Sequence, residues 1–229
     1  MQEDKEMESK VTAWMSWSSG KDSMMALDAV RTEGIVEVTA LLTTVESGTD
    51  RVATHAVRRS LLQAQADRLS LPLVTVEIPE HCSNEEYESR MDEAFSGARA
   101  TDVTQIIFGD LFLRDVRAYR EEHLAKTGLR PIFPLWDRPT DLLSHEMLQL
   151  GIKAVVTCVD RTQLDGTFAG RRFDTEFLGE LPPHVDPCGE NGEFHTFVWD
   201  GPGFISPIDI EVGQVSERDG FSFCDVTPM

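Results

Sequence analysis

Buried strands alternate with helical segments through the first half of the chain, and this alternation limits the possible folds more than any other feature. Short apolar runs rich in β-formers predict strands, whereas apolar residues at helical spacing predict helices. The expected strands are residues 11–17, 36–44, 73–78 and 104–108, and the expected helices are 22–33, 55–69 and 84–99. Strands separated by such helices imply right-handed βαβ crossovers. The first half is therefore predicted to be an α/β domain built on a doubly wound parallel sheet.

The second half is less regular. Three prolines punctuate residues 131–139 (PIFPLWDRP), which predicts an extended linker or an edge strand and a soft domain boundary near residue 130. The elements expected beyond it are a short helix at 141–150, a buried strand at 153–159 and β-like runs at 194–199, 207–212 and 221–226. We therefore expect a domain at 1–130 and a smaller α+β domain at 131–229.

Charge and composition restrict the partners. The chain has 21 Lys and Arg against 40 Asp and Glu, a formal net charge of −19. Such a surface repels phosphate backbones, so a nucleic acid partner is not favoured. Residues 114–138, with six basic and four acidic side chains, are the only segment whose charge would favour binding of an anion. No apolar run is long enough to cross a membrane, and the first ten residues lack the apolar core of a signal peptide. The four cysteines form no CxxC pair. We therefore expect a cytoplasmic protein.

The first predicted strand ends in Ser18-Ser19-Gly20-Lys21-Asp22-Ser23 and runs straight into a helix. In open parallel sheets ligands bind beyond the carboxyl ends of the strands. Small residues let the backbone approach an anion, and the free amides at a helix start favour phosphate. Asp22 suits a helix cap or a Mg²⁺ ligand. The loop is neither a Walker A motif nor a GxGxxG motif. A serine-rich turn with an ordinary cap is the plainer alternative.

SSGKDS at residues 18–23 resembles the SGGxDS motif of the PP-loop ATP pyrophosphatases, with Ser19 in place of the first glycine. A second set of motifs resembles the diphthine–ammonia ligase family, in which a PP-loop is paired with a C-terminal EGGE-type motif. The matching segments are Gly109-Asp110-Leu111, Asp115-Val116-Arg117, His55, Gln65, Leu71-Pro72 and 188–196 (CGENGEFHT). The resemblance covers roughly residues 11–203.

This resemblance implies a Rossmann-like domain of the adenine nucleotide alpha hydrolase type that binds ATP with Mg²⁺. It further implies attack of a substrate carboxylate on ATP to give an acyl-adenylate and pyrophosphate, followed by attack of ammonia. The acceptor, a small molecule or a protein, stays open. The residues expected to bind ATP are Ser18, Ser19, Gly20, Lys21, Asp22 and Ser23 for the phosphates, and Thr43, Thr44, Gly109 and Asp110 for the nucleoside.

The remaining expected roles fall in both halves. Lys21 would offset charge on the phosphates and Asp22 would hold the metal. Glu190 and Glu193 would ligate Mg²⁺, orient ammonia or accept its proton, although solvated turn carboxylates are the alternative. The candidates for substrate binding are His55, Arg117, His195 and Thr196. A packed histidine and a solvated helix face are the plainer interpretations of His195 and Arg117.

Several alternatives stay open from the sequence. Cys188 is either a catalytic thiol paired with His195 or a structural cysteine near the site. A PP-loop enzyme that activates RNA is disfavoured by the acidic charge and the lack of a basic domain. A non-enzymatic ATP sensor would not need Glu190 and Glu193. Apolar residues 221–223 would suit either pairing across subunits or closure of the small domain, so a homodimer remains open.

Overall fold

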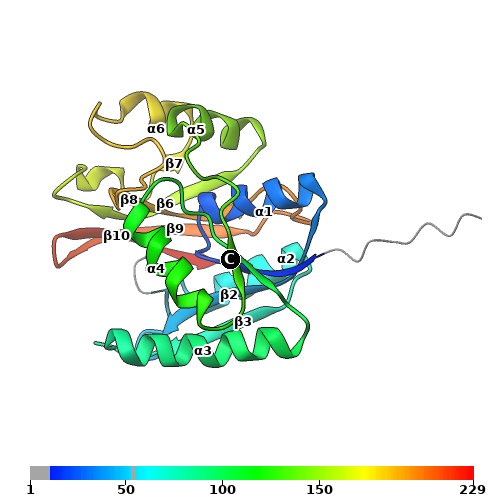
Figure 1. Cartoon of the computed structure of the whole chain (residues 1–229). Coiled ribbons are helices and arrows are strands. Elements are labelled where there is room, and N and C mark those ends of the chain that lie inside the picture. The colour runs from blue at the N-terminus through cyan, green and yellow to red at the C-terminus, as the bar shows by residue number, and fades with distance from the viewer. Residues whose placement is uncertain (1–10, 53–54) are drawn as a thin grey trace, which may run out of the picture.

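A computed structural model describes residues 11–52 and 55–229, in which the chain folds around two five-stranded sheets (Figure 1). The first sheet consists of β1 (Val11–Ser16), β2 (Val36–Glu46), β3 (Leu73–Ile78), β4 (Gln105–Ile107) and β5 (Arg130–Ile132). The second consists of β6 (Lys153–Asp160), β7 (Arg172–Phe173), β8 (Phe194–Asp200), β9 (Ile210–Arg218) and β10 (Phe221–Pro228). The helices are α1 (Lys21–Glu33), α2 (Arg59–Leu69), α3 (Asn84–Ala100), α4 (Arg114–Ala125), α5 (Thr140–Gln149) and α6 (Thr175–Glu180), with a 3₁₀ turn at Gly166–Phe168.

The first sheet is parallel throughout, in the order β3-β2-β1-β4-β5. Successive residues of β1 point to opposite faces, as the pleat requires. Ala13 and Met15 pack into the cluster that contains α1 and α2, and Trp14 packs into the cluster of α3 and α4. The predicted doubly wound α/β sheet is therefore confirmed. Strand order reverses at β1, where such sheets form a ligand crevice.

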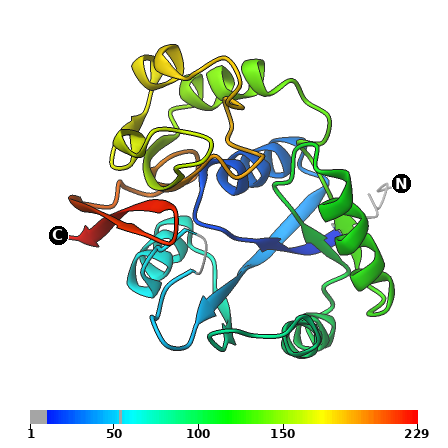
Figure 2. The same cartoon turned by 90° about the vertical axis from the view of Figure 1, so that its left-hand side faces the viewer.

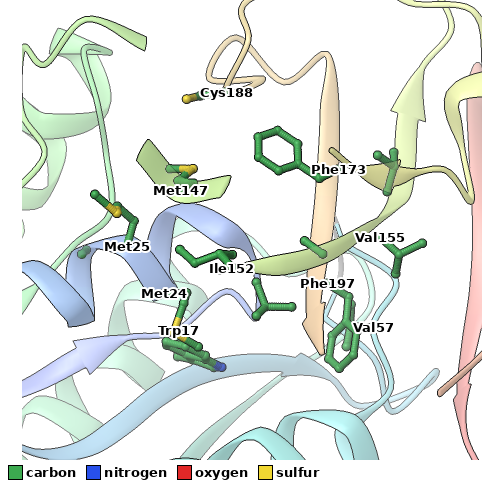
Figure 3. Close-up of a cluster of buried hydrophobic side chains, with 14 of the residues drawn as sticks. Trp17, Met24, Met25, Val57, Met147, Ile152, Val155, Phe173, Cys188 and Phe197 are labelled. Carbon is green, nitrogen blue, oxygen red and sulfur yellow. The ribbon is translucent and has the colours of Figure 1, made fainter. Parts of the chain in front are cut away.

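The second sheet is antiparallel, and it continues the core of the first. Its strand β6 pairs with β7, β8 and β10. Figure 3 shows Trp17 after β1, Met24 on α1, Met147 on α5 and Phe197 on β8 gathered in one cluster. The smaller α+β part is confirmed, and its buried side chains join those of α1 in one cluster.

Two predicted elements begin at the wrong residue. The helix expected at 55–69 starts at Arg59, because Ala56 has a left-handed φ of 53° and Arg58 is extended and ion-paired with Asp225 of β10. His55 therefore lies in the loop before α2. Figure 2 shows the β9–β10 hairpin beside this helix. The strand expected at 207–212 runs instead from Ile210 to Arg218, and its exposed residues carry no apolar period that would mark it.

Other differences concern the edges of the two sheets. β5 pairs with β4, so the proline-rich stretch does begin as an edge strand, and the predicted boundary at 130/131 falls within it. Residues 221–223 lie in β10, which pairs with both β6 and β9 of its own chain. They close the second sheet, and both of their edges are used there. Over the two described ranges, no helix combines the length and the apolarity that a bilayer crossing requires.

Gly109 brings the end of β4 against the first turn of α1, and this contact yields a stability prediction. A Cβ at position 109 would lie 3.0 Å from the carbonyl carbon and oxygen of Asp22 and from the amide of Ser23. Because backbone must move to admit it, Gly109→Ala is expected to lower the free energy of unfolding by about 1–3 kcal/mol. Urea denaturation measures this change.

The matched control is Gly97→Ala, in the exposed interior of α3, where an added Cβ meets nothing within 4 Å. This change is expected to raise the free energy of unfolding by up to about 1 kcal/mol, because alanine is the better helix former. Equal effects of the two substitutions would contradict the close approach at Gly109.

Candidate active site

The loop between β1 and α1 is held in an unusual backbone conformation. Ser19 has a φ of 72° and is fully buried. Glycine adopts this left-handed region at the lowest cost, which accounts for the glycine in the motif that this loop resembles. The carbonyl of Ser19 accepts hydrogen bonds from the amide of Val198 (3.0 Å) and from Nε2 of Gln65 (3.0 Å). These two bonds hold the loop against β8 and α2.

Gln65 connects three separate parts of the site. Its side chain is fully buried on α2. Oε1 accepts from the indole of Trp17 at 2.7 Å, and Nε2 donates to the carbonyls of Ser19 and Val198, the latter at 2.6 Å. Every polar atom of this amide is therefore used. Gln65 fixes the loop and β8 relative to α2.

The start of α1 is also fastened to β8. Oγ1 of Thr196 accepts a hydrogen bond from the amide of Lys21 at 3.2 Å. A Cβ at Gly20 would lie 3.2 Å from the Thr196 carbonyl, so only a residue without a side chain fits there comfortably. Ser18 and Ser23 place their hydroxyls 3.2 Å apart on the open side of the loop. Ser18, Lys21, Asp22 and Ser23 line one cavity, which therefore lies at the N-terminal, positive end of α1.

The side chain of Lys21 lies between the two halves of the chain. Its Nζ pairs with Oδ2 of Asp22 at 3.0 Å and donates to the carbonyl of Cys188. It also lies 5.0 Å from the ring centroid of Phe194. Burial opposes the charge, but the carboxylates of Asp22 and Asp186 outweigh it and hold the pKa of Lys21 above its usual value. The ammonium group is thus charged and already paired.

The loop that carries the second motif folds around two carboxylates. Oδ1 of Asp186 accepts from the amides of Cys188 and Glu190, and Oε1 of Glu193 accepts from the amide of Asp186 (2.9 Å) and from Nδ2 of Asn191 (3.0 Å). Glu193 is only 2% exposed and does not line the cavity. Its observed contacts are those of a residue that shapes the loop.

Glu190, in contrast, faces the cavity. Its Oε1 accepts from the amides of Leu111 (2.7 Å) and Phe112 (3.3 Å), which precede α4. Burial raises the pKa of Glu190 to about 7 despite these two donors, and the nearby Asp22 and Asp110 act in the same direction. A carboxyl group with this pKa changes its protonation state near neutral pH.

Two adjoining cavities lie at the carboxyl ends of β1, β2 and β4. The first, of about 240 Å³, brings together the loop of residues 18–23 (the phosphate-type loop, named for its resemblance to the PP-loop), the second motif and two further segments. Its lining includes Ser18, Lys21, Asp22 and Ser23 of the loop, Glu190, His195 and Thr196 of the second motif, and His55, Gly109 and Asp110. The second, of about 220 Å³, is lined by Thr43, Thr44, Tyr87, Met91 and others. Both are lined by Ser16, Ser18, His55, Phe108 and Arg120. Together they reach the size expected of a ligand site.

His55 and His195 lie against each other on the wall of the first cavity, with ring centroids 4.4 Å apart. Burial lowers the pKa of His195 to about 4, and the charge of Lys21 adds to this effect. Burial and His195 likewise hold the pKa of His55 well below its usual value. Both rings are therefore neutral at pH 7.

The structure gathers most of the predicted site residues and places a few elsewhere. Arg117 lies on α4 away from the cavities, where it pairs with Glu121 and stacks on Phe133 and Trp136. Arg120, one turn further along the helix, lines both cavities instead and was not singled out from the sequence. The rotation of α4 about its axis determines which of the two arginines faces the cavities. The sequence does not show which face of α4 this is.

Asp22 and Cys188 are the candidates for metal binding and for nucleophilic attack, respectively. Oδ1 of Asp22 is buried at the cavity and has no hydrogen-bond partner among the described residues, which fits a carboxylate that would hold Mg²⁺. The thiol of Cys188 points instead to the carbonyl of Thr140, and burial raises its pKa far above the usual range. A protonated, buried thiol is a poor nucleophile, so the geometry favours a structural Cys188.

Comparison with known families gives two matches that together span most of the chain. Residues 10–131 match the family model of the diphthamide synthase N-terminal domain. Residues 139–227 match the family model of the diphthamide synthase C-terminal domain.

The relatives include diphthine–ammonia ligases of animals. The chain is 29% identical to that of Bos taurus over 151 residues, which are 63% of this chain and 56% of the cattle protein. It is 27% identical to that of Homo sapiens over 188 residues, 75% of this chain and 70% of the human protein. Among solved structures, a tRNA thiolase from Methanococcus maripaludis is 16% identical with a TM-score of 0.37, covering 62% of this chain and 59% of that one.

The buried amide of Gln65 yields a second stability prediction. Gln65→Leu would leave the Trp17 indole and the Val198 carbonyl without partners, so the free energy of unfolding should fall by about 2–4 kcal/mol. Gln63→Leu on the exposed face of the same helix should change it by less than about 0.5 kcal/mol. Urea unfolding compares the two, and a small effect at Gln65 would contradict its connecting role.

The neutral His195 predicts a specific pH dependence of stability. Below the ordinary histidine pKa of about 6.5 the unfolded chain binds a proton that folded His195 rejects down to about pH 4, so stability falls in this window. Between pH 7 and 4.5 the wild type should lose on the order of 2 kcal/mol more than His195→Gln. Urea unfolding at both pH values measures the difference, and parallel losses would show that His195 titrates normally.

Proposed function

This chain belongs to the diphthamide synthase family, and from that premise we propose that it is an ATP-dependent ligase that forms an amide from a carboxylate and ammonia. The observation that carries the proposal is the meeting of two motifs in one cavity: the loop of residues 18–23 and the Glu190 loop. A phosphate-binding turn alone would suit a sensor. A carboxyl group with a pKa near 7 on the opposite wall gives the cavity a group for proton transfer.

In the first proposed step, an oxygen of the acceptor carboxylate attacks the α-phosphorus of ATP. The bond between this phosphorus and the bridging oxygen of the β-phosphate breaks, and pyrophosphate leaves. The amides and hydroxyls of residues 18–23, at the positive end of α1, would bind the leaving phosphates. Preorganised donors of this kind stabilise the charge that develops in the transition state. The second cavity, with Thr43 and Thr44, would hold adenine and ribose.

In the second proposed step, ammonia attacks the carbonyl carbon of the acyl-adenylate and AMP leaves. The nitrogen must lose one proton, and ionised Glu190 would accept it. The neutral imidazoles of His55 and His195 form the wall beside this group and would contact the acceptor. Asp22 would hold Mg²⁺, which when bound supplies positive charge beside the phosphates.

The products of ATP cleavage test the proposal. Purified protein is incubated with Mg²⁺ and α-labelled ATP, with and without ammonium and a mixture of small carboxylic acids that includes a diphthine-containing peptide. AMP is the expected product, increased by acceptor and ammonium together. ADP would mean phosphoryl transfer and would contradict the proposed reaction, and tight ATP binding without any product would favour a sensor.

The proton acceptor is tested by Glu190→Gln, which should lower amide formation by about 10²–10⁴-fold while ATP binding is retained. The wild-type rate should fall as pH drops through about 7, where Glu190 takes up a proton. Because the supply of free ammonia also changes with pH, Glu190→Gln is the reference, and it should lack this inflection. Glu180→Gln, an exposed glutamate that pairs with Arg171, is the matched control and should behave as wild type. A wild-type profile without the inflection would exclude Glu190 as the base.

A further inference from the structure

Arg120 on α4 lies where the two cavities meet. Of the lysine and arginine residues in the described part of the chain, it is the one that lines both. The first cavity lies beside the phosphate-type loop and the second beside Thr43 and Thr44. A nucleotide that fills both cavities would place the phosphates nearest its ribose at this junction.

The cleft has little other positive charge to offer an anion. Lys21 is paired with Asp22 and with the carbonyl of Cys188, and only 1% of its surface is exposed. His55 and His195 are neutral. In a chain with a net charge of −19, a nucleotide therefore needs a cation that is still within reach.

The guanidinium group of Arg120 is oriented for such a contact. It stacks on the Phe108 ring at 4.4 Å and pairs with Asp110: Nη2 donates a hydrogen bond to Oδ1 at 3.1 Å, and Nε lies 2.7 Å from Oδ2 as an ion-pair contact outside hydrogen-bond geometry. The Phe108 ring and the Asp110 carboxylate together fix the orientation of the Arg120 guanidinium group. Phosphate oxygens accept from the same fork that a carboxylate occupies. With 29% of its side chain exposed, Arg120 is accessible to a ligand in the cleft.

We propose that Arg120 binds a phosphate of the nucleotide in exchange for Asp110, and so supplies the positive charge that Lys21, buried and paired, does not. This inference rests on the proposed nucleotide cleft and assigns a binding residue within it. The resemblance to PP-loop enzymes suggested Lys21 for this charge, whereas the geometry points to Arg120.

The experiment measures the binding of ATP and of adenosine to the full chain by isothermal titration calorimetry. Arg120→Met should weaken ATP binding by about 10- to 100-fold, the loss of one or two charge-assisted hydrogen bonds, and leave adenosine binding unchanged. Arg120→Lys should restore part of the ATP affinity, because it keeps the charge and loses the fork.

Arg171→Met is a closely matched control. Arg171 is 28% exposed, stacks on Phe168 at 4.8 Å and pairs with Glu180 at 2.6 Å, but it lines neither cavity. Its replacement should leave the binding of both ligands as in wild type. Equal ATP affinity of Arg120→Met and wild type would overturn the inference, as would an equal loss for ATP and adenosine. Wild-type protein that binds ATP but forms no AMP would contradict the proposed ligase reaction. The comparison of ATP and adenosine binding between wild type and Arg120→Met would still test the role of Arg120.

Discussion

The buried ammonium group of Lys21 holds the two halves of the molecule together at the point where a ligand would bind. It belongs to the first turn of α1, yet its partners include the Cys188 carbonyl and the Phe194 ring of the C-terminal half. A buried charge is stable only when it is paired and hydrogen-bonded, and removal of one partner of such a pair typically costs about 3–5 kcal/mol. Lys21 thus ties the Glu190 loop directly to the loop of residues 18–23.

Hydrogen bonds from neutral groups reinforce the same junction. Gln65 and Val198 hold the carbonyl of Ser19, and Thr196 accepts from the amide of Lys21. Each contact joins residues that are far apart in sequence. The two sheets therefore meet along α1 and β8 in one buried cluster, and residues from both sides of this junction line the first cavity. In the proposed site, backbone amides, the helix dipole and one arginine would together let an acidic chain bind an anion.

Much of the fold could be predicted because its causes are local. The alternation of apolar strands and amphipathic helices fixed the parallel sheet, and the small residues at 18–23 marked the turn that faces the cavity. The strand expected at 207–212 was placed too early, because the exposed residues that extend β9 to Arg218 present no apolar face. The start of α2 was predicted too early. Arg58 is extended and ion-paired with Asp225, which is distant in sequence, so the helix begins only at Arg59.

The candidate site was predicted in outline, since the two motifs do meet in one cavity. The individual roles depend on directions that a sequence does not contain. Glu190 and Glu193 lie three residues apart, yet one faces the cavity and the other the interior of its loop. Arg117 and Arg120 differ in the same way around α4. The contact of His55 with His195 arises only from tertiary packing.

A crystal structure of the full chain with Mg²⁺ and a non-hydrolysable ATP analogue would show directly where Lys21 and the phosphates lie. If Lys21 is the internal cation between the two halves, the phosphates should lie on the amides of residues 18–23. Nζ of Lys21 should then remain within hydrogen-bond distance of Asp22 and of the Cys188 carbonyl when the analogue is bound. A Lys21 side chain that has left these two partners for the phosphates, with the Glu190 loop displaced, would contradict this role of Lys21.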